Sequence, residues 1–219
     1  MVKFIAGIDE AGRGPLIGPL VIAGVLVAEK DVPKLVALGV KDSKLLSPAQ
    51  REGMFEAIKG IVKDYKIIIV QPQEVDAAVE SVDGLNLNWL EAHKTADILN
   101  ALKPDKAFID CPSTNIKKYT EYLKDLLKNS MELVVEHKSD FLHKETGAAS
   151  ILAKVTRDRE IEKLQKKVKE PLGSGYPSDP ITKEFVKKYW KKYPDIFRHS
   201  WSTYKVIADP EKQSGLDKF

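Results

Sequence analysis

The stretch that decides the fold is Phe4-Ile-Ala-Gly-Ile-Asp-Glu-Ala-Gly-Arg-Gly-Pro15. Its first half is an apolar run that predicts a buried strand, and the adjacent carboxylates of Asp9 and Glu10 end that run. Burying unpaired carboxylates costs roughly several kcal/mol unless a cation or hydrogen bonds compensate the charge. A divalent metal ion is the simplest compensation. The glycines that follow predict a turn whose backbone N–H groups a ligand can approach closely.

Apolar and helical patterns along the rest of the chain predict an α/β fold. Five apolar, β-branched runs predict strands over residues 3–9, 20–27, 65–70, 106–110 and 131–137. Helical periodicity and capping signals predict helices over residues 48–61, 86–102, 116–128 and 145–169. Strands that come first in succession and then alternate with helices indicate a five-stranded mixed sheet, antiparallel at its start and parallel at its finish, with helices covering its faces.

The segment from Pro171 to Pro180 is the clearest break in the chain because it is dense in turn-forming residues. It predicts a catalytic body over residues 1–170 and a C-terminal helical extension over residues 171–219. The extension should contain a helix that ends near Pro194, packed on the body. We expect the tail from about residue 209 to be poorly ordered.

Composition indicates a cytoplasmic protein. The 219 residues are 43% hydrophobic, enough for one domain with a sizeable core. Cys111 is the single cysteine, so no intrachain disulfide framework exists and a reducing compartment is favoured. The first residues lack the layout of a signal peptide, and no apolar run approaches the roughly 20 residues that span a bilayer. We therefore expect no membrane association, and a monomer.

The last quarter of the chain is its basic part. Residues 157–205 contain 13 Lys and Arg against 7 Asp and Glu, whereas the net charge of the whole chain is only +3. Lysines at positions 183, 187, 188, 191 and 192 alternate with aromatic residues at 185, 189, 190 and 193. This pattern is compatible with phosphate contacts to a nucleic acid, and equally with a solvated helix face above an aromatic packing stripe.

Further carboxylates are placed to join the acidic pair at one edge of the sheet. Asp110 ends the strand Lys106–Asp110, just as Asp9 ends the first, and Asp140 follows the last strand closely. Carboxylates at the ends of neighbouring strands converge, and hard oxygen ligands suit Mg²⁺ or Mn²⁺. The spacing alone leaves open that Asp110 caps a helix and that Asp140 starts one. Without clustered cysteine or histidine, a zinc site is not expected.

Six motifs together resemble the ribonuclease HII family, in its archaeal type, from residue 3 to about residue 205. They are Gly7-Ile-Asp-Glu-Ala-Gly-Arg-Gly-Pro15, Lys41-Asp-Ser-Lys-Leu-Leu-Ser47, Phe108-Ile-Asp110, Ala148-Ala-Ser-Ile-Leu-Ala-Lys154, Gly173-Ser-Gly-Tyr-Pro-Ser-Asp179 and His199-Ser-Trp-Ser-Thr203. The resemblance implies a ribonuclease H-like fold. It also implies an endonuclease that cuts the RNA strand of RNA/DNA hybrids and duplex DNA containing single ribonucleotides.

The resemblance assigns roles residue by residue. The four catalytic carboxylates that hold the metal would be Asp9, Glu10, Asp110 and Asp140. The residues that bind the substrate would be Gly12, Arg13 and Gly14 at the ribose 2′-hydroxyl, Tyr176 on the following sugar, and Ser43 and Lys44 at a phosphate. Water would attack with the help of two cations, bridged by Asp9, and leave 5′-phosphate and 3′-hydroxyl ends.

One segment departs from the family pattern. After Asp140 the chain reads Phe141-Leu-His-Lys-Glu-Thr-Gly147, where the family carries a small residue followed by tyrosine. A local supporting role for His143 beside the acidic site is left open, but we expect a loop histidine exposed to solvent. Ser150, in the Ala-Ala-Ser motif, is expected to pack a helix against the sheet rather than touch substrate.

Two other functions remain open on the residues alone. A nuclease of the resolvase or integrase type, which cuts only DNA, would have a similar acidic site but no use for the Gly12–Gly14 turn beside it. A non-catalytic nucleic-acid-binding module could use the basic helix. It would leave the clustered carboxylates unexplained, because they repel phosphate unless a metal intervenes.

Overall fold

The computed structural model describes residues 2–40, 47–82 and 84–208, and its contacts divide the chain into two compact units. The first unit contains Met1–Ala11, Val21–Ile69 and Leu87–Thr156. The second contains Gly12–Leu20, Val70–Asn86 and Arg157–Phe219. The expected division into a catalytic body over residues 1–170 and a C-terminal extension over residues 171–219 stays a prediction.

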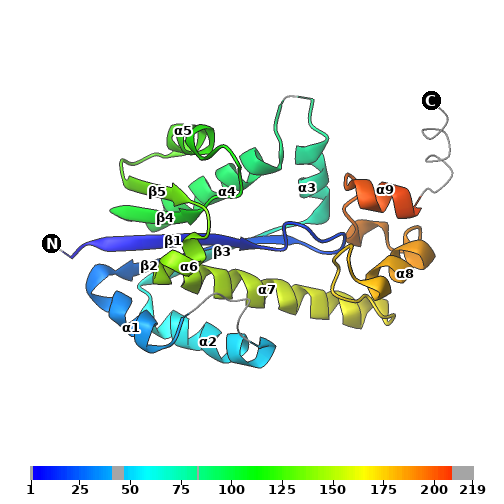
Figure 1. Cartoon of the computed structure of the whole chain (residues 1–219), viewed down its shortest axis with the longest axis horizontal. Helices are drawn as coiled ribbons and strands as arrows, with labels where there is room; N and C mark the ends of the chain where they lie inside the picture. The colour runs from blue at the N-terminus through cyan, green and yellow to red at the C-terminus, as the bar shows by residue number, and fades with distance from the viewer. Residues whose placement is uncertain (1, 41–46, 83, 209–219) are drawn as a thin grey trace. The chain divides into compact units, whose positions relative to one another are not determined.

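The first unit is built on a five-stranded sheet of order β3-β2-β1-β4-β5 (Figure 1). The strands are β1 (Phe4–Ala11), β2 (Leu20–Ala28), β3 (Asp64–Val70), β4 (Lys106–Asp110) and β5 (Glu132–Glu136). β1 pairs antiparallel with β2 and parallel with β4, and β4 pairs parallel with β5. The predicted mixed sheet, with its antiparallel start and parallel finish, is confirmed.

Helices cover both faces of this sheet (Figure 1). One face carries α4 (Leu87–Leu102) and α5 (Ile116–Leu126); the other carries α1 (Val32–Ala37), α2 (Pro48–Ile61) and the start of α7 (Lys144–Val168). The buried core on the second face joins β2 residues such as Val25 to Ile58 of α2 and Ile151 of α7. Ser47 is the N-cap of α2, in agreement with the capping signal at the start of the helix predicted over residues 48–61, and it forms a capping box with Gln50.

Close packing at one glycine places α7 against β1. A Cβ built on Gly7 would lie 2.3 Å from the backbone nitrogen of Thr146, which is nearer than any real contact allows. The glycine in the decisive stretch is therefore required because the beginning of α7 lies against the strand. This contact brings the Ala148–Ala153 part of α7 onto the face of β1 that carries Asp9.

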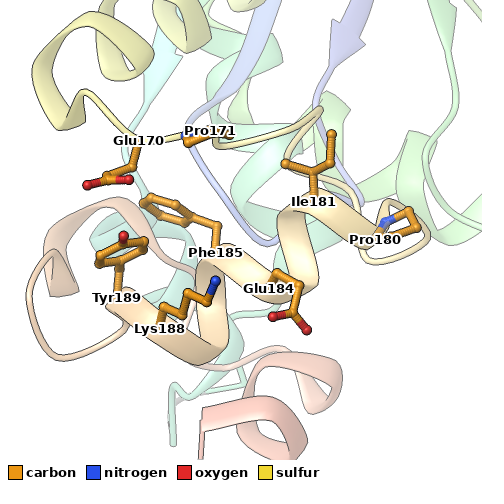
Figure 2. Close-up of a pocket in the computed structure, with 8 residues that line it drawn as sticks. All are labelled: Glu170, Pro171, Pro180, Ile181, Glu184, Phe185, Lys188 and Tyr189. Atoms are coloured by element: carbon orange, nitrogen blue, oxygen red, sulfur yellow. The ribbon is translucent and has the colours of Figure 1, made fainter.

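The second unit has a core of its own. Its helices are α3 (Pro72–Val79), α8 (Pro180–Tyr189) and α9 (Ser202–Ala208), with a 3₁₀ turn η3 (Pro194–Ile196) and the end of α7. Leu16, Ile17, Phe185 and Phe197 belong to one buried cluster, and Ile17 pairs with Phe197 as an isolated antiparallel bridge. A groove of about 450 Å³ lies along α8 beside Glu170 and Pro171 (Figure 2).

Within the described residues, the helices that the sequence did not predict are short. They are α1, α3, α6 (Ser139–Leu142) and α9, together with the 3₁₀ turns η1 (Glu29–Asp31) and η3. None has more than eight residues, which is too little for a helical period to emerge. No helix in the described parts of the chain is long and apolar enough to cross a membrane.

Candidate active site

Asp9 is a buried carboxylate near the end of β1, with 5% of its surface exposed. Gly7 and Asp9 lie on the face of the sheet that α7 covers, because alternate residues of a strand point to the same side. The Asp9 carboxylate accepts a hydrogen bond from the backbone N–H of Glu10, at 2.7 Å, and another from the side chain of Ser150 on α7. Ser150 therefore holds a predicted catalytic residue in place as well as packing a helix.

Asp110 and Asp140 come from the neighbouring part of the sheet. Asp110 is the last residue of β4, and its Oδ1 accepts a hydrogen bond from the backbone N–H of Ser139 at 3.0 Å. Asp140 lies in α6, and the side chain of Asp140 is buried. The helix starts after Lys138, whose backbone is in the left-handed conformation (φ 61°). The bond from Ser139 ties α6 to the end of β4 and so brings the two carboxylates near each other.

Electrostatics link these three carboxylates. The pKa of Asp9 rises from 3.8 to about 8, chiefly because burial disfavours the charged form. The negative charges of Asp110 and Asp140 raise it further, whereas the hydrogen bonds from Ser150 and Glu10 oppose the rise. A buried carboxylate with two acidic neighbours is a strong site for a cation, because a positive charge relieves both burial and repulsion.

Glu10 belongs to the opposite face of β1. Its charge contributes to raising the pKa of the Cys111 thiol and of the Tyr119 hydroxyl, although burial is the larger cause for both. Tyr119 is on α5, and Glu91 of α4, itself 2% exposed, acts on the same two groups. Glu10 and Asp9 are thus adjacent in sequence but have different surroundings.

The donor set fits a hard divalent cation. Every predicted ligand is a carboxylate, which is the oxygen donor that Mg²⁺ and Mn²⁺ prefer. Within residues 2–40, 47–82 and 84–208, no three acidic, histidine or cysteine side chains are already gathered at ligand distance around one point. Asp9, Asp110 and Asp140 are close enough for the charges of Asp110 and Asp140 to raise the pKa of Asp9.

The expectation for His143 was wrong. Its side chain is only 27% exposed, its Nε2 lies 2.7 Å from Oε1 of Glu136, and its ring stacks on Phe108 with centroids 3.8 Å apart. Phe141 and Leu142, in the same atypical segment, are the exposed residues. His143 therefore anchors the segment that follows Asp140 to β4 and β5.

The predicted ribose-reading turn is in the second unit, together with Tyr176. Gly12 has φ +86°, and a Cβ on Gly14 would lie 3.9 Å from Cε1 of Tyr176, so the structure brings these predicted residues together. Tyr176 is 37% exposed, and its ring stacks on the guanidinium of Arg157, whose Cζ is 5.2 Å from the ring centroid. Tyr176 thus has a flat face supported from behind by a cation.

Arg157 is a buried cation that sequence reasoning did not assign. It is 2% exposed, its Nη2 donates to the carbonyl of Ser174 at 3.3 Å, and burial lowers the pKa of its guanidinium. Its Nε has no hydrogen-bond partner among the described residues. The signal available in sequence was the Arg157-Asp158 pair after the Ala-Ala-Ser motif, but its partners across the fold cannot be read from spacing.

Two predicted substrate-binding residues, Ser43 and Lys44, lie outside the described residues. Their contact with a phosphate therefore stays a prediction.

The loop that carries Tyr176 is held in place by its hydrogen bonds. Asp179 accepts from the backbone N–H groups of Ser174 and Ile181, at 2.6 and 2.9 Å, and so both closes the loop and caps α8.

Comparisons with known proteins identify the family of this chain. The family model described as Ribonuclease HII matches residues 6–204. Ribonuclease HII from Pyrococcus horikoshii is 46% identical over 222 residues, covering 98% of each chain. Ribonuclease HII from Pyrococcus furiosus is 45% identical over 224 residues, covering 98% of this chain and 97% of the relative.

Solved structures agree over the same length. The crystal structure of ribonuclease H2 from P. horikoshii has a TM-score of 0.86 at 44% identity, covering 96% of this chain and all of the other. A second structure, the complex of PCNA with RNase HII from Archaeoglobus fulgidus, has a TM-score of 0.81 at 38% identity, covering 91% and 95%. With a family model that spans nearly the whole chain and relatives that match it end to end, this chain belongs to the ribonuclease HII family of divalent-metal-dependent endonucleases.

Proposed function

We propose that this chain hydrolyses the RNA strand of RNA/DNA hybrids and cuts duplex DNA on the 5′ side of single embedded ribonucleotides. The observation that carries the proposal is Asp9, buried beside the carboxylates of Asp110 and Asp140. Such a group repels a phosphodiester unless a cation lies between them. Membership of the ribonuclease HII family supports the ribonuclease activity over the alternative of a nuclease that cuts only DNA.

The four carboxylates would hold the metal, Mg²⁺ or Mn²⁺. Asp9, Glu10, Asp110 and Asp140 are the residues that would be its ligands. When bound, the cations supply an activated water and stabilise the leaving 3′-oxygen. Asp9 itself is oriented by Ser150 and by the backbone N–H of Glu10. Because water rather than the 2′-hydroxyl attacks, the products carry 5′-phosphate and 3′-hydroxyl ends.

Recognition of ribose is assigned to the turn at Gly12, Arg13 and Gly14. The 2′-hydroxyl distinguishes RNA from DNA, and it can both donate and accept a hydrogen bond. Gly12 follows Glu10 by two residues, so the chain keeps the Cα atom of Gly12 within roughly 7 Å of the Cα atom of Glu10. Tyr176 would stack on the sugar beyond the scissile bond, and Ser43 and Lys44 would contact a phosphate.

The decisive experiment is cleavage of duplex DNA that holds one ribonucleotide, with the cut position mapped. A cut on the 5′ side of the ribonucleotide, with a 5′-phosphate on the downstream product, is the expected result. Cleavage of the matched all-DNA duplex at a similar rate would instead establish the alternative nuclease. No cleavage of either duplex in Mg²⁺ or Mn²⁺ would overturn the enzyme assignment.

Metal binding is measured separately from activity. Mg²⁺ or Mn²⁺ should raise the melting temperature of the wild-type protein, since a ligand that binds only the folded state stabilises it. Asp9→Asn should remove most of this shift, whereas Asp125→Asn, at an exposed position of α5, should retain it. Equal metal-induced shifts in all three proteins would exclude Asp9 as a ligand.

A protein partner is suggested by one of the similar structures. The A. fulgidus relative was solved in complex with PCNA and aligns with 91% of this chain. We propose that this chain also binds a PCNA-type clamp. Titration calorimetry of PCNA with the full chain, and with a second chain that ends at Ala208, tests this proposal. Absence of heat exchange with the full chain would contradict the proposal.

Two expectations about the cellular state are proposed as well. The thiol of Cys111 is buried and free, which fits a reducing cytoplasm. We also propose that the protein acts as a monomer on its nucleic-acid substrate. Light scattering of the purified chain should give a mass near 24.5 kDa.

A further inference from the structure

We propose that Arg198 is a positioning residue for the turn formed by Gly12, Arg13 and Gly14. Its guanidinium would hold the carbonyl groups of the turn on one side so that amide N–H groups face the ribose on the other. This inference rests on the proposed function of the turn in reading a 2′-hydroxyl. It also gives a role to the segment from Arg198 to Thr203, which the proposed mechanism does not use.

The contacts of Arg198 are with two residues of the turn and with Gly18, four residues beyond it. The side chain is fully buried. Its Nη2 donates to the carbonyl of Gly12 at 2.6 Å, its Nη1 donates to the carbonyl of Arg13 at 2.8 Å, and Nε and Nη2 donate to the carbonyl of Gly18 at 3.2 and 3.0 Å. A single planar fork therefore fixes three backbone oxygens between residues 12 and 18.

The geometry of the peptide bond converts these contacts into a direction for the amide groups. The peptide bonds of the described residues are all trans, so each C=O points opposite to the N–H of the next residue. The carbonyl of Gly12 points toward Arg198, hence the N–H of Arg13 points away from it. The same holds for the carbonyl of Arg13 and the N–H of Gly14. Two successive donors are thereby aimed to the side opposite the guanidinium.

Neighbouring side chains hold Arg198 in this position. Asp76 of α3 accepts hydrogen bonds from the backbone N–H groups of His199 and Ser200, at 2.8 and 3.0 Å, and from the Ser200 hydroxyl at 2.6 Å. The guanidinium also stacks on Trp201, with Cζ 5.1 Å from the ring centroid. His199 Nε2 lies 2.8 Å from the carbonyl of Pro194. The segment after Arg198 is thus anchored at several points.

A guanidinium suits this task better than an ammonium group. Lysine presents a compact charge that cannot reach three carbonyls from one plane, whereas arginine has five donors in a rigid fork. Arg198→Lys keeps the positive charge and most of the side-chain volume but loses the geometry. It therefore separates positioning of the turn from a simple electrostatic attraction for nucleic acid.

The first test compares the kinetics of wild type, Arg198→Lys and Val168→Ala on a duplex with one ribonucleotide. Val168→Ala removes buried methyl groups from the core cluster of the same unit and leaves the guanidinium of Arg198 in place, so it is a control for general loss of stability. Misplaced recognition groups impair orientation of the reacting phosphate, so we expect kcat of Arg198→Lys to fall on the order of 100-fold with KM within about threefold. Asp76→Asn should also lower kcat, by a smaller factor than Arg198→Lys.

The second test measures binding preference with cleavage blocked by Asp9→Asn. We expect Asp9→Asn alone to bind the duplex with one ribonucleotide more tightly than the same all-DNA duplex. The double variant Asp9→Asn/Arg198→Lys should lose that preference while still binding DNA. A change confined to general folding would weaken binding to both duplexes equally.

The outcomes separate this inference from the proposed function on which it rests. A wild-type kcat in Arg198→Lys, or an unchanged preference in the double variant, overturns the positioning role and leaves the function intact. A loss in Arg198→Lys no larger than that of Val168→Ala at equal melting temperature also overturns it. Lack of any preference in Asp9→Asn alone refutes the reading of ribose by the turn, and the inference with it.

Discussion

Gly12 lies directly against the side chain of Arg157, since a Cβ built on Gly12 would be 2.4 Å from Cδ and 2.5 Å from Nε of the arginine. The same Cβ would be 2.8 Å from the carbonyl oxygen of Pro19, and the glycine has φ +86°. Both the available space and the backbone conformation therefore exclude a side chain at this position. The arginine in turn supports the ring of Tyr176, so the turn and the aromatic face share one buried cation.

Gly12→Ala should consequently lose both stability and activity. The substitution forces Arg157 or the backbone at Pro19 to move, and we expect a melting temperature several degrees lower and a kcat reduced by more than tenfold, roughly. Gly39→Ala is the matched control, because Gly39 also has positive φ (+80°) but no atom within 4 Å of its Cβ position. Equal effects of the two substitutions on activity would show that backbone strain alone is responsible.

Gly14→Ala separates recognition from folding. Gly14 has only Tyr176 Cε1 near its Cβ position, at an ordinary distance of 3.9 Å, so the folded chain accommodates a methyl group there. We expect an unchanged melting temperature but weaker cleavage at a lone ribonucleotide, because the methyl group would lie where the ribose approaches the backbone. Cleavage at the wild-type rate would contradict contact between Gly14 and the sugar.

Asp9→Asn should stabilise the metal-free protein while abolishing turnover. Burial and neighbouring carboxylates raise the pKa of Asp9 from 3.8 to about 8, so the folded state binds a proton more tightly than the unfolded state. Between these two values the free energy of unfolding falls as pH rises. Asparagine removes that dependence, and the melting temperature of the variant should exceed that of wild type in chelator at pH 8.

The measurement is a series of thermal melts in chelator from pH 5 to pH 9. Asp125→Asn, at an exposed carboxylate, should follow the wild-type curve. If the melting temperatures of Asp9→Asn and wild type depend on pH in the same way, the pKa of Asp9 is not raised in the folded chain.

The sequence predicted the sheet well because strands depend on local patterns, and the same patterns indicated which carboxylates lie at strand ends. Apolar runs mark β1 and β2, and carboxylates at the ends of β1 and β4 need only strand direction to be brought together. The strand Lys106–Asp110 was predicted with its observed bounds, and the helix expected over residues 86–102 differs from α4 by one residue. Gly7 could be recognised as special only once α7 was seen against it.

The contacts that the sequence did not reveal join distant residues. Arg198 and Gly12 are 186 positions apart, and neither spacing nor periodicity indicates that they meet. Ser150 looked like a packing residue because it lies within the apolar run from Ala148 to Ala153, yet its side chain forms a hydrogen bond with Asp9. His143 looked exposed because polar residues follow it, whereas Glu136 and Phe108 hold it. Tertiary partners of polar side chains decide these roles.

The basic surface of α8 is expected to contribute non-specific affinity for nucleic acid. Lys183, Lys187 and Lys188 are exposed, while Phe185 of the same helix is buried in the core of its unit. Removal of the whole segment would therefore disrupt packing, and substitution is the better test. A variant with all three lysines changed to glutamine should keep its melting temperature and bind hybrid more weakly.

The salt dependence of binding reports how many phosphates these lysines neutralise. For each phosphate that is no longer neutralised, the slope of log K against log salt should fall by about 0.9 on a duplex. Glu184→Gln, on the same helix at an exposed position, is a control that changes charge in the opposite direction. An unchanged slope in the triple variant would assign these lysines to a solvated face without a role in binding.

Tyr176 should matter most where RNA meets DNA. Tyr176 is partly exposed, and its ring contacts Arg157 on one side and lies next to Gly14. The sugar of the nucleotide that follows the recognised ribose can therefore stack on this ring. On a continuous RNA/DNA hybrid, the enzyme can bind at several positions along the RNA strand, because every ribonucleotide carries a 2′-hydroxyl. A lone ribonucleotide in DNA allows only one such position. We therefore expect Tyr176→Ala to reduce kcat/KM more on duplex DNA with one ribonucleotide than on an RNA/DNA hybrid.

Tyr176→Phe keeps the ring and its stack on Arg157, so it should retain most of the wild-type preference between the two substrates. The ratio of kcat/KM values on the two substrates is the quantity to measure, since a general loss of folded protein cancels in it. Equal losses on both substrates in Tyr176→Ala would assign the tyrosine to packing of its loop. A selective loss that phenylalanine restores would instead establish that a flat ring, rather than the hydroxyl, recognises the junction.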